Sequence, residues 1–133
     1  MNINRALKLT VFTALAIAIF HVLAVIFYLY WFYWWFDIPL HLLGGLCVGF
    51  FSMWSFASYA EDRYEISYTR LLLSALAGAF LVGIAWELFE YVQGIDFNSI
   101  GSYPLDTLKD MFMDLCGGYF SYLYLKITNF IKK

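Results

Sequence analysis

Residues 37–49, DIPLHLLGGLCVG, carry an acid, a histidine and two glycines at steps of four residues: Asp37, His41, Gly45 and Gly49. On a helix, side chains four residues apart lie almost above one another. This segment therefore predicts a helix with one narrow face that is polar at one end and nearly free of side chains at the other. Such a polar end is costly in lipid unless it meets polar groups from other helices.

Two later segments repeat this pattern. One ends on a carboxylate, with the series Ala75, Ala79, Gly83 and Glu87; the other begins on carboxylates, with the series Asp106, Asp110, Asp114 and Gly118. Three helices of this kind, threaded in alternating directions, would bring their polar ends to one layer. Their glycines and alanines would let the backbones approach closely, as small residues do between membrane helices.

The composition is that of an integral membrane protein. Of the 133 residues, 63% are hydrophobic and 14% are charged, whereas about a quarter of the residues in a soluble domain are charged. The net charge is −2 and the sequence has no basic nucleic-acid patch, so we expect no nucleic-acid partner. The expected surrounding is a lipid bilayer.

The lengths of the uncharged runs predict the number of spans. The runs 9–36 and 38–60 are longer than the ~20 residues that cross the hydrocarbon core, whereas 71–86 and 115–125 are shorter. Acids next to the shorter runs must therefore enter the membrane. We expect an all-α, four-helix transmembrane bundle in a single domain, residues 1–133, with helices at about 9–36, 38–58, 71–91 and 105–127.

Basic residues predict the orientation. One side of the four-helix arrangement receives seven of them, and the other side only Lys109; the seven are Arg5, Lys8, Arg63, Arg70, Lys126, Lys132 and Lys133. Because basic flanks stay in the cytoplasm, both termini are expected there. The chain would then be a multi-pass protein of the cell (inner or plasma) membrane, with its acids in the outer third of the bilayer.

Six ionisable side chains are candidate metal ligands: Asp37, His41, Glu87, Glu90, Asp110 and Asp114. Five carboxylates cannot all stay ionised together in lipid. Either protons neutralise them, or a divalent metal cation does, with the histidine and several carboxylate oxygens as ligands. Each of the three helices offers at least two potential ligands, as metal sites in helical bundles require. Mn, Fe, Mg, Ca or Zn would suit this oxygen-rich set.

Three segments resemble the small YjdF-like and VanZ-like polytopic membrane proteins. They are Asp37-x-x-x-His41-x-x-Gly44-Gly45, Trp86-Glu87-Leu88-Phe89-Glu90-Tyr91 and Asp106-Thr107-x-x-Asp110-Met111-x-x-Asp114-x-x-Gly117. The resemblance implies a multi-span cell-envelope protein, in the VanZ-like case one associated with glycopeptide resistance. VanZ-like proteins typically have Gln in place of Glu90, Asn in place of Asp114 and an Arg in the following loop, so that role does not carry over. The YjdF-like match is better at Glu87 and Glu90 and implies no settled activity.

Three classes of function remain open at this point. The first is a metal-dependent enzyme acting on a lipid head group or envelope precursor, with Glu90 as the general base for metal-bound water. The second is a proton- or cation-coupled transporter or channel subunit, which with four helices would need a homo-oligomer or another partner. The third is a structural or accessory protein whose carboxylates form a protonated network.

The remaining polar features have simpler expectations. His21 is expected to be a neutral structural histidine that lies deeper in the membrane than the acids. Cys47 and Cys116 are expected to be packing residues. The loop 92–104 is long enough to cover the polar pocket as a lid.

Overall fold

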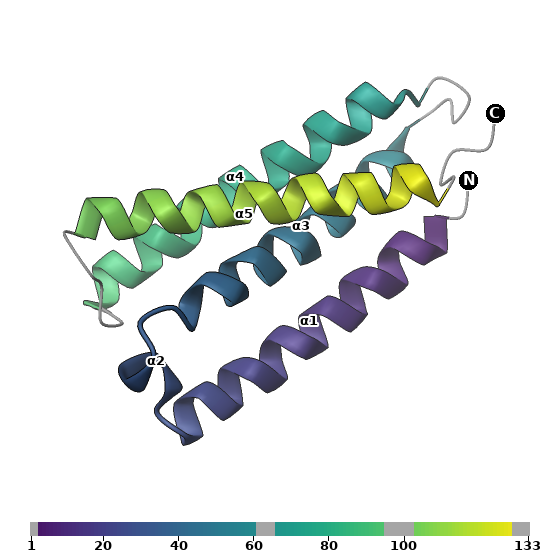
Figure 1. The fold of residues 1–133 in the computed structure, drawn as a ribbon. Helices are drawn as coiled ribbons and strands as arrows, with labels where there is room; N and C mark the ends of the chain where they lie inside the picture. Colours follow the sequence, from purple (N-terminus) through teal and green to yellow (C-terminus); the bar gives the residue numbers. More distant parts are fainter. Residues whose placement is uncertain (1–2, 61–65, 95–102, 129–133) are drawn as a thin grey trace.

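The computed structural model of the chain describes residues 3–60, 66–94 and 103–128, and all of their regular secondary structure is helical. The helices are α1 (Ile3–Ile26), α2 (Leu29–Phe32), α3 (Asp37–Tyr59), α4 (Tyr68–Gln93) and α5 (Tyr103–Ile127). Figure 1 shows the four long helices side by side. The all-α prediction is confirmed.

Helix α3 is the centre of the bundle. It packs against α1, α4 and α5, while α4 also packs against α5. The start of α1 and the end of α5 lie at the same end of the bundle, as Figure 1 shows. A hydrogen bond that Arg5 Nη2 donates to the Tyr124 hydroxyl, 3.0 Å away, joins them there. The opposite end holds α2, the start of α3 and the start of α5.

Three of the described helices are long and apolar enough to cross a membrane, over Asn4–Ile26, Asp37–Tyr59 and Tyr68–Gln93. Helix α5 has 25 residues and is equally long, but its first half carries Asp106, Lys109, Asp110 and Asp114. These charges keep it below the hydropathy of a typical span. Length and apolarity therefore support three membrane-spanning helices and a fourth, more polar helix packed among them.

The predicted first helix, 9–36, is wrong in its second half. Helix α1 ends at Ile26, and Tyr28 adopts the left-handed conformation, with φ of 56°, before the short helix α2 begins. The turn carries Tyr30 back against the bundle, where its side chain is buried, and its ring meets that of Phe36 edge-on at 5.6 Å. Because residues 9–36 carry no charge, all of them can lie in the membrane, but the run does not show where the helix ends.

The ends of α3, α4 and α5 follow ordinary helix signals. Pro39 and Pro104 lie in first turns, where a missing N–H is tolerated. Ser67 caps the start of α4 by accepting a hydrogen bond from the backbone N–H of Arg70. Gly94 ends α4 in the left-handed conformation, with φ of 64°, which costs glycine little. Glu87 and Glu90 are thereby fixed in the last two turns of α4.

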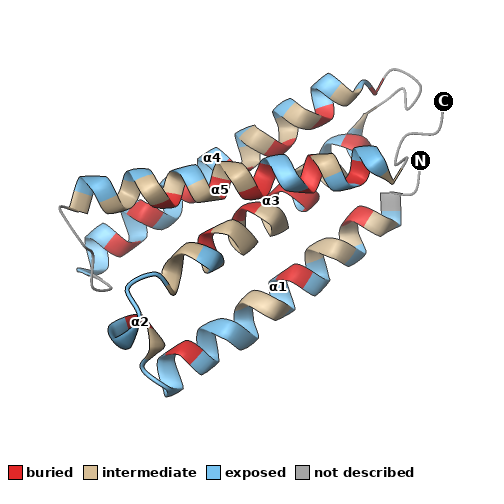
Figure 2. Cartoon of the chain, viewed as in Figure 1, coloured by how far each residue is buried: buried red, intermediate tan, exposed pale blue. Residues whose placement is uncertain are grey.

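The apolar core lies in the half of the bundle that contains the first turns of α1 and the last turns of α5. It consists of buried side chains from all four long helices and the segment before α4: Ala6, Phe50, Met53, Ala57, Ile66, Leu71, Ala75, Tyr122 and Leu125. Figure 2 shows these buried positions along the inner faces of the helices, with exposed positions facing outward. Exposed apolar side chains suit a lipid surrounding.

Between the apolar core and the polar end, α3 and α5 are in backbone contact. A Cβ atom at Gly45 would overlap the carbonyl oxygen of Asp114, and one at Gly117 would overlap the carbonyl oxygen of Leu42. Only glycine allows this approach. The close packing of glycines that the sequence predicts is therefore present, and it fixes the distance between the acids of the two helices.

Candidate functional site

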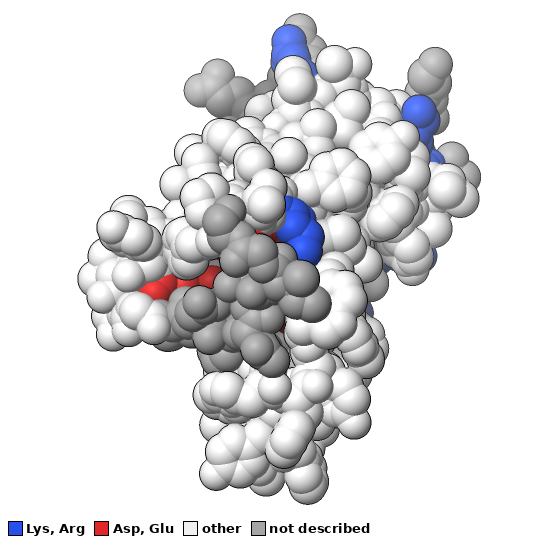
Figure 3. Space-filling model, turned by 60° about the vertical axis from the view of Figure 1, so that its left-hand side comes forward, with Lys and Arg blue, Asp and Glu red and all other residues white. Residues whose placement is uncertain are grey.

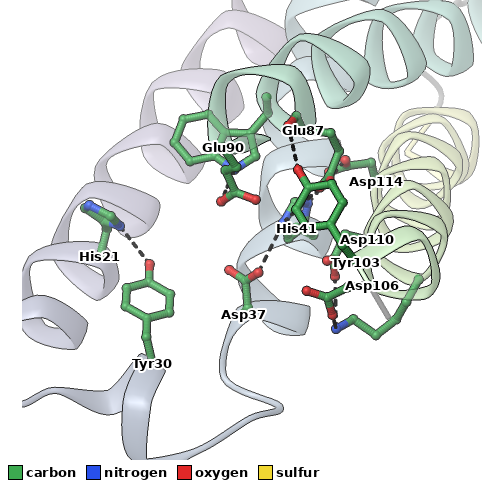
Figure 4. Close-up of polar contacts among 12 residues, drawn as sticks. His21, Tyr30, Asp37, His41, Glu87, Glu90, Tyr103, Asp106, Asp110 and Asp114 are labelled. Atoms are coloured by element: carbon green, nitrogen blue, oxygen red, sulfur yellow. Dashed lines mark hydrogen bonds and ion pairs between the residues drawn. The ribbon is translucent and has the colours of Figure 1, made fainter. Parts of the chain in front are cut away.

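His41 lies at the centre of the polar end of the bundle. Its Nε2 atom is 3.4 Å from Asp37 Oδ2 and 4.0 Å from Glu87 Oε1, while its Nδ1 atom is 3.3 Å from Asp114 Oδ2. Figure 4 shows these carboxylates converging on the imidazole from three different helices. One histidine thus contacts acids from α3, α4 and α5.

The structure brings all six sequence-predicted residues together. One group of potential ligand atoms within 4.8 Å of one another comes from Asp37, His41 and Glu90, and a second comes from His41, Glu87 and Asp110. Asp114 joins through its contact with His41 Nδ1. All six are buried except Asp37, which is partly exposed. The second group is therefore the inner one, and Asp37 lies nearest the surface.

Three atoms of the inner group lack a hydrogen-bond partner. These buried atoms are His41 Nε2, Glu87 Oε1 and Asp110 Oδ1. Asp37 Oδ2 is near enough to His41 Nε2 for an ion pair, but the two do not form a hydrogen bond. A buried polar atom without a partner costs about 1–3 kcal/mol, and more if it is charged. The described side chains place charged groups of Asp37 and Lys109 near two of these atoms, but they give none of the three a hydrogen bond.

Positive charge is scarce around the cluster. In the described parts of the chain, Lys109 is the Lys or Arg side chain that pairs with these acids: it forms an ion pair with Asp106 and lies 3.5 Å from Asp110 Oδ1. From the sequence alone, Lys109 counts only as one of the basic residues that predict the orientation of the chain in the membrane. Its spacing of three residues from Asp106 is the helical ion-pair signal that could have revealed this role.

Two further contacts hold the acids of α4. Trp86 Nε1 donates a hydrogen bond of 2.9 Å to Glu90 Oε1, and the Tyr103 hydroxyl donates one of 3.1 Å to the backbone carbonyl of Glu87. Sequence reasoning missed both. The four-residue spacing of Trp86 and Glu90 could have indicated the first contact, whereas the second joins α4 to α5 and has no local signal.

The prediction that His21 lies deeper in the membrane than the acids is wrong. Because α1 ends at Ile26, His21 is only five residues from the end of its helix, and His41 is four residues from the start of α3. At ~1.5 Å per residue both lie within about two turns of the same end of the bundle. Figure 4 shows His21 facing Tyr30 beside the cluster.

The hydroxyl of Tyr30 lies 2.7 Å from His21 Nδ1. Burial, together with the nearby charges of Asp37 and Glu90, raises the pKa of Tyr30 above its ordinary value. The two side chains are in hydrogen-bond contact, and the tautomer of the imidazole decides which of them donates. A structural role for His21 agrees with this contact, whose partner, Tyr30, the sequence did not indicate.

A cavity of about 300 Å³ lies beside the cluster, between α1, α3 and α4. His21, Tyr30, Asp37, His41 and Asp114 line it at polar positions, and the rest of its wall is apolar side chains, alanine and glycine. In Figure 3 acidic atoms show as small patches at this end of the molecule, and basic atoms lie beside one of them. Most of the loop 92–104, whose length permits a lid, lies outside the described residues, at 95–102.

The chain belongs to the family described as "Predicted membrane protein (DUF2238)", whose match covers residues 1–129. No curated protein and no solved structure matches the chain. Membership of this family supports the conclusion that the chain is a membrane protein, but it assigns no activity to it. It leaves the function to be argued from the geometry of the site.

Proposed function

We propose that this protein binds one divalent metal cation at the polar end of the bundle and uses it as a membrane enzyme acting on a lipid or envelope-precursor substrate. The observation that carries the proposal is that two buried atoms without a hydrogen-bond partner, His41 Nε2 and Glu87 Oε1, lie 4.0 Å apart. In octahedral geometry, two ligand atoms that share one ion at ~2.1 Å lie about 3.0 Å apart if they are adjacent and about 4.2 Å apart if they are opposite, so a separation of 4.0 Å fits nearly opposite ligands. An ion between them would satisfy both atoms.

The charges of the cluster support the same conclusion. Five carboxylates, from Asp37, Glu87, Glu90, Asp110 and Asp114, share one imidazole and the single ammonium of Lys109. Such an excess of negative charge in a buried site must be neutralised by protons or by a cation. A proton on either atom would supply a donor, but at 4.0 Å His41 Nε2 and Glu87 Oε1 are too far apart to share one hydrogen bond, whereas one cation can bind both.

The inner group would hold the ion, with His41, Glu87 and Asp110 as ligands and Asp114 orienting the imidazole through Nδ1. A bound divalent cation lowers the pKa of water and polarises ester or phosphoryl oxygens. Glu90 is suited to act as the general base, because Trp86 fixes one of its carboxylate oxygens and leaves the other able to accept a proton.

We also propose that α5 crosses the membrane with the other three long helices and that both termini are cytoplasmic. The start of α1 and the end of α5 lie at one end of the bundle together with Arg5, Lys8, Arg70 and Lys126. The metal site would then lie in the outer leaflet of the cell membrane. A C-terminal tag that can be labelled from outside intact cells would reject this orientation.

Elemental analysis of the detergent-purified protein tests the metal site. The parent protein should retain about one equivalent of a transition metal or alkaline-earth ion per chain after loading and dialysis, and a Glu87→Gln, Asp110→Asn double variant should lose it. Asp106→Asn is the matched control, because Asp106 pairs with Lys109 and belongs to neither ligand group. A parent protein that retains no more metal than the double variant would refute the proposal.

The alternative is a proton-neutralised network in an accessory protein or transporter subunit. In that case neither the parent protein nor any variant retains metal, and a pH titration of the carboxylates in the cluster would show them to be protonated at neutral pH. The same samples therefore decide between the two candidate functions.

A further inference from the structure

The cavity beside the cluster opens sideways between α1 and α4. At its rim, Val82 and Trp86 of α4 are 49% and 45% exposed, and Ala18 of α1 is also exposed. Both helices are apolar and long enough to span a membrane. Exposed side chains at this level therefore face hydrocarbon and not water, so that the opening leads into the bilayer.

The floor of the cavity is made of positions without bulky side chains. Gly44 and Gly45 of α3 and Gly83 and Ala79 of α4 leave a slot whose wall is largely backbone and methyl groups. A slot with apolar walls excludes water and favours a hydrocarbon chain. Its volume of about 300 Å³ is at the lower end of ligand pockets, which run from roughly 300 to 1,000 Å³. It therefore accommodates part of one chain.

The polar end of the slot favours a positive charge. Asp37, His41 and Asp114 line it, and no Lys or Arg is among the described lining residues. The aromatic rings of Tyr30 and Trp86 border the same slot, and aromatic faces attract ammonium groups. His41 is 6% exposed and lines the slot beside Asp37 and Asp114, so the polar end of the slot carries two carboxylates close together.

We propose that this slot binds one hydrocarbon chain of a membrane lipid with an ammonium head group, which reaches the acid cluster sideways from the bilayer. The chain lies over the glycines of α3 and α4, and the ammonium lies against Asp37, the acid nearest the surface. Binding of this lipid does not need the metal. As a statement about the substrate class, however, the inference rests on the proposed function.

Native mass spectrometry of the detergent-solubilised protein tests the lipid. Phosphatidylethanolamine and phosphatidylglycerol with identical acyl chains differ in the ammonium, and free ethanolamine supplies the ammonium without a chain. One phosphatidylethanolamine per protein should be retained about tenfold more strongly than phosphatidylglycerol, and free ethanolamine should not displace it. Equal retention of the two lipids, or displacement by ethanolamine, would overturn the proposal.

Two variants test the place of binding. Ala18→Trp fills the slot from its rim and should abolish lipid retention, while Ala14→Trp adds the same ring to an exposed position of α1 outside the slot and should not. Asp37→Asn should bring phosphatidylethanolamine retention down to the level of phosphatidylglycerol. Retention by Ala18→Trp equal to that of Ala14→Trp would refute the site even if both proteins are well folded.

The lipid experiment and the metal experiment test the two proposals independently of each other. Lipid retention measured in chelator should equal retention with added Mn, and Ala18→Trp should keep its metal. A protein that binds no metal but selects phosphatidylethanolamine contradicts the enzyme proposal alone. A protein that binds metal but retains the lipids equally contradicts the lipid inference alone.

Discussion

The two halves of the bundle are equally buried and chemically opposite. In the apolar half, Met53, Leu71 and Leu125 are at most 1% exposed; in the polar half, Asp110 and Glu87 are 2% and 7% exposed. The same three helices, α3, α4 and α5, build both halves. Among the described residues, the buried side-chain atoms without a hydrogen-bond partner all lie in the polar half. An apolar packing region and a polar cluster are thus separated along the length of the same helices.

The glycine contact between α3 and α5 joins the two halves, and breaking it should have the largest effect. Gly45→Ala places a methyl group on the backbone of Asp114, so the helices must separate. We expect a loss of more than ~3 kcal/mol of stability, at the upper end for overpacking. Size-exclusion profiles and thermal unfolding in detergent measure it. Gly44→Ala, whose methyl would lie 3.6 Å from Asp114 Oδ1, is the control and should be tolerated.

Damage confined to the apolar half should be insensitive to metal. Leu125→Ala leaves a cavity in a core position that is 1% exposed. We expect a loss of about 2 kcal/mol, near the low end for such cavities, because the unfolded helix stays in lipid. Melting curves should show the same loss with chelator, with added Mn, and at pH 6 or 8. A loss that depends on metal would mean that the two halves are coupled.

Removing a charge from the polar half should have opposite effects on stability with and without bound metal. With Mn or Zn bound, Glu87→Gln should weaken binding about tenfold and lower stability by about 1.4 kcal/mol. In chelator the amide relieves repulsion between carboxylates, so the variant should be as stable as the parent or more stable. Because acid protonates the parent cluster, this advantage should shrink as the pH falls. A variant more stable than the parent under metal-replete conditions would exclude the metal site.

The smallest effect is expected at the turn between α1 and α3. Tyr30→Phe removes the hydroxyl that contacts His21 Nδ1 and keeps the buried ring. The cost should be about 1 kcal/mol, the usual value of one hydrogen bond, with no change in metal content. Thermal unfolding and elemental analysis of the same sample check both parts. Loss of metal in this variant would show that the turn supports the cluster directly.

Much of the candidate site could be predicted because it depends on local geometry. The four-residue steps fix which side chains share a helix face, and the alternating direction of three helices fixes which faces meet. Asp37, His41, Glu87, Glu90, Asp110 and Asp114 converge for that reason. The ranges of α3, α4 and α5 differ from the predicted 38–58, 71–91 and 105–127 by three residues at most.

The contacts between distant residues could not be predicted in the same way. The Tyr103 hydroxyl meets the carbonyl of Glu87 only because α4 and α5 pack at one angle and distance. Whether His41 Nε2 finds a hydrogen bond also depends on angles that three helices set together. The spacing of residues along the sequence does not predict such geometry.

The sequence by itself determined the membrane class, the helical faces and the set of ionisable side chains that meet, because composition and periodicity are properties of single segments. Only the tertiary structure decided that α1 ends at Ile26, that Tyr28 turns Tyr30 back onto His21, and that a slot opens between α1 and α4. The absence of charge alone does not distinguish a continuous helix from a helix that is followed by a turn. The burial of one aromatic ring against the bundle selects the turn.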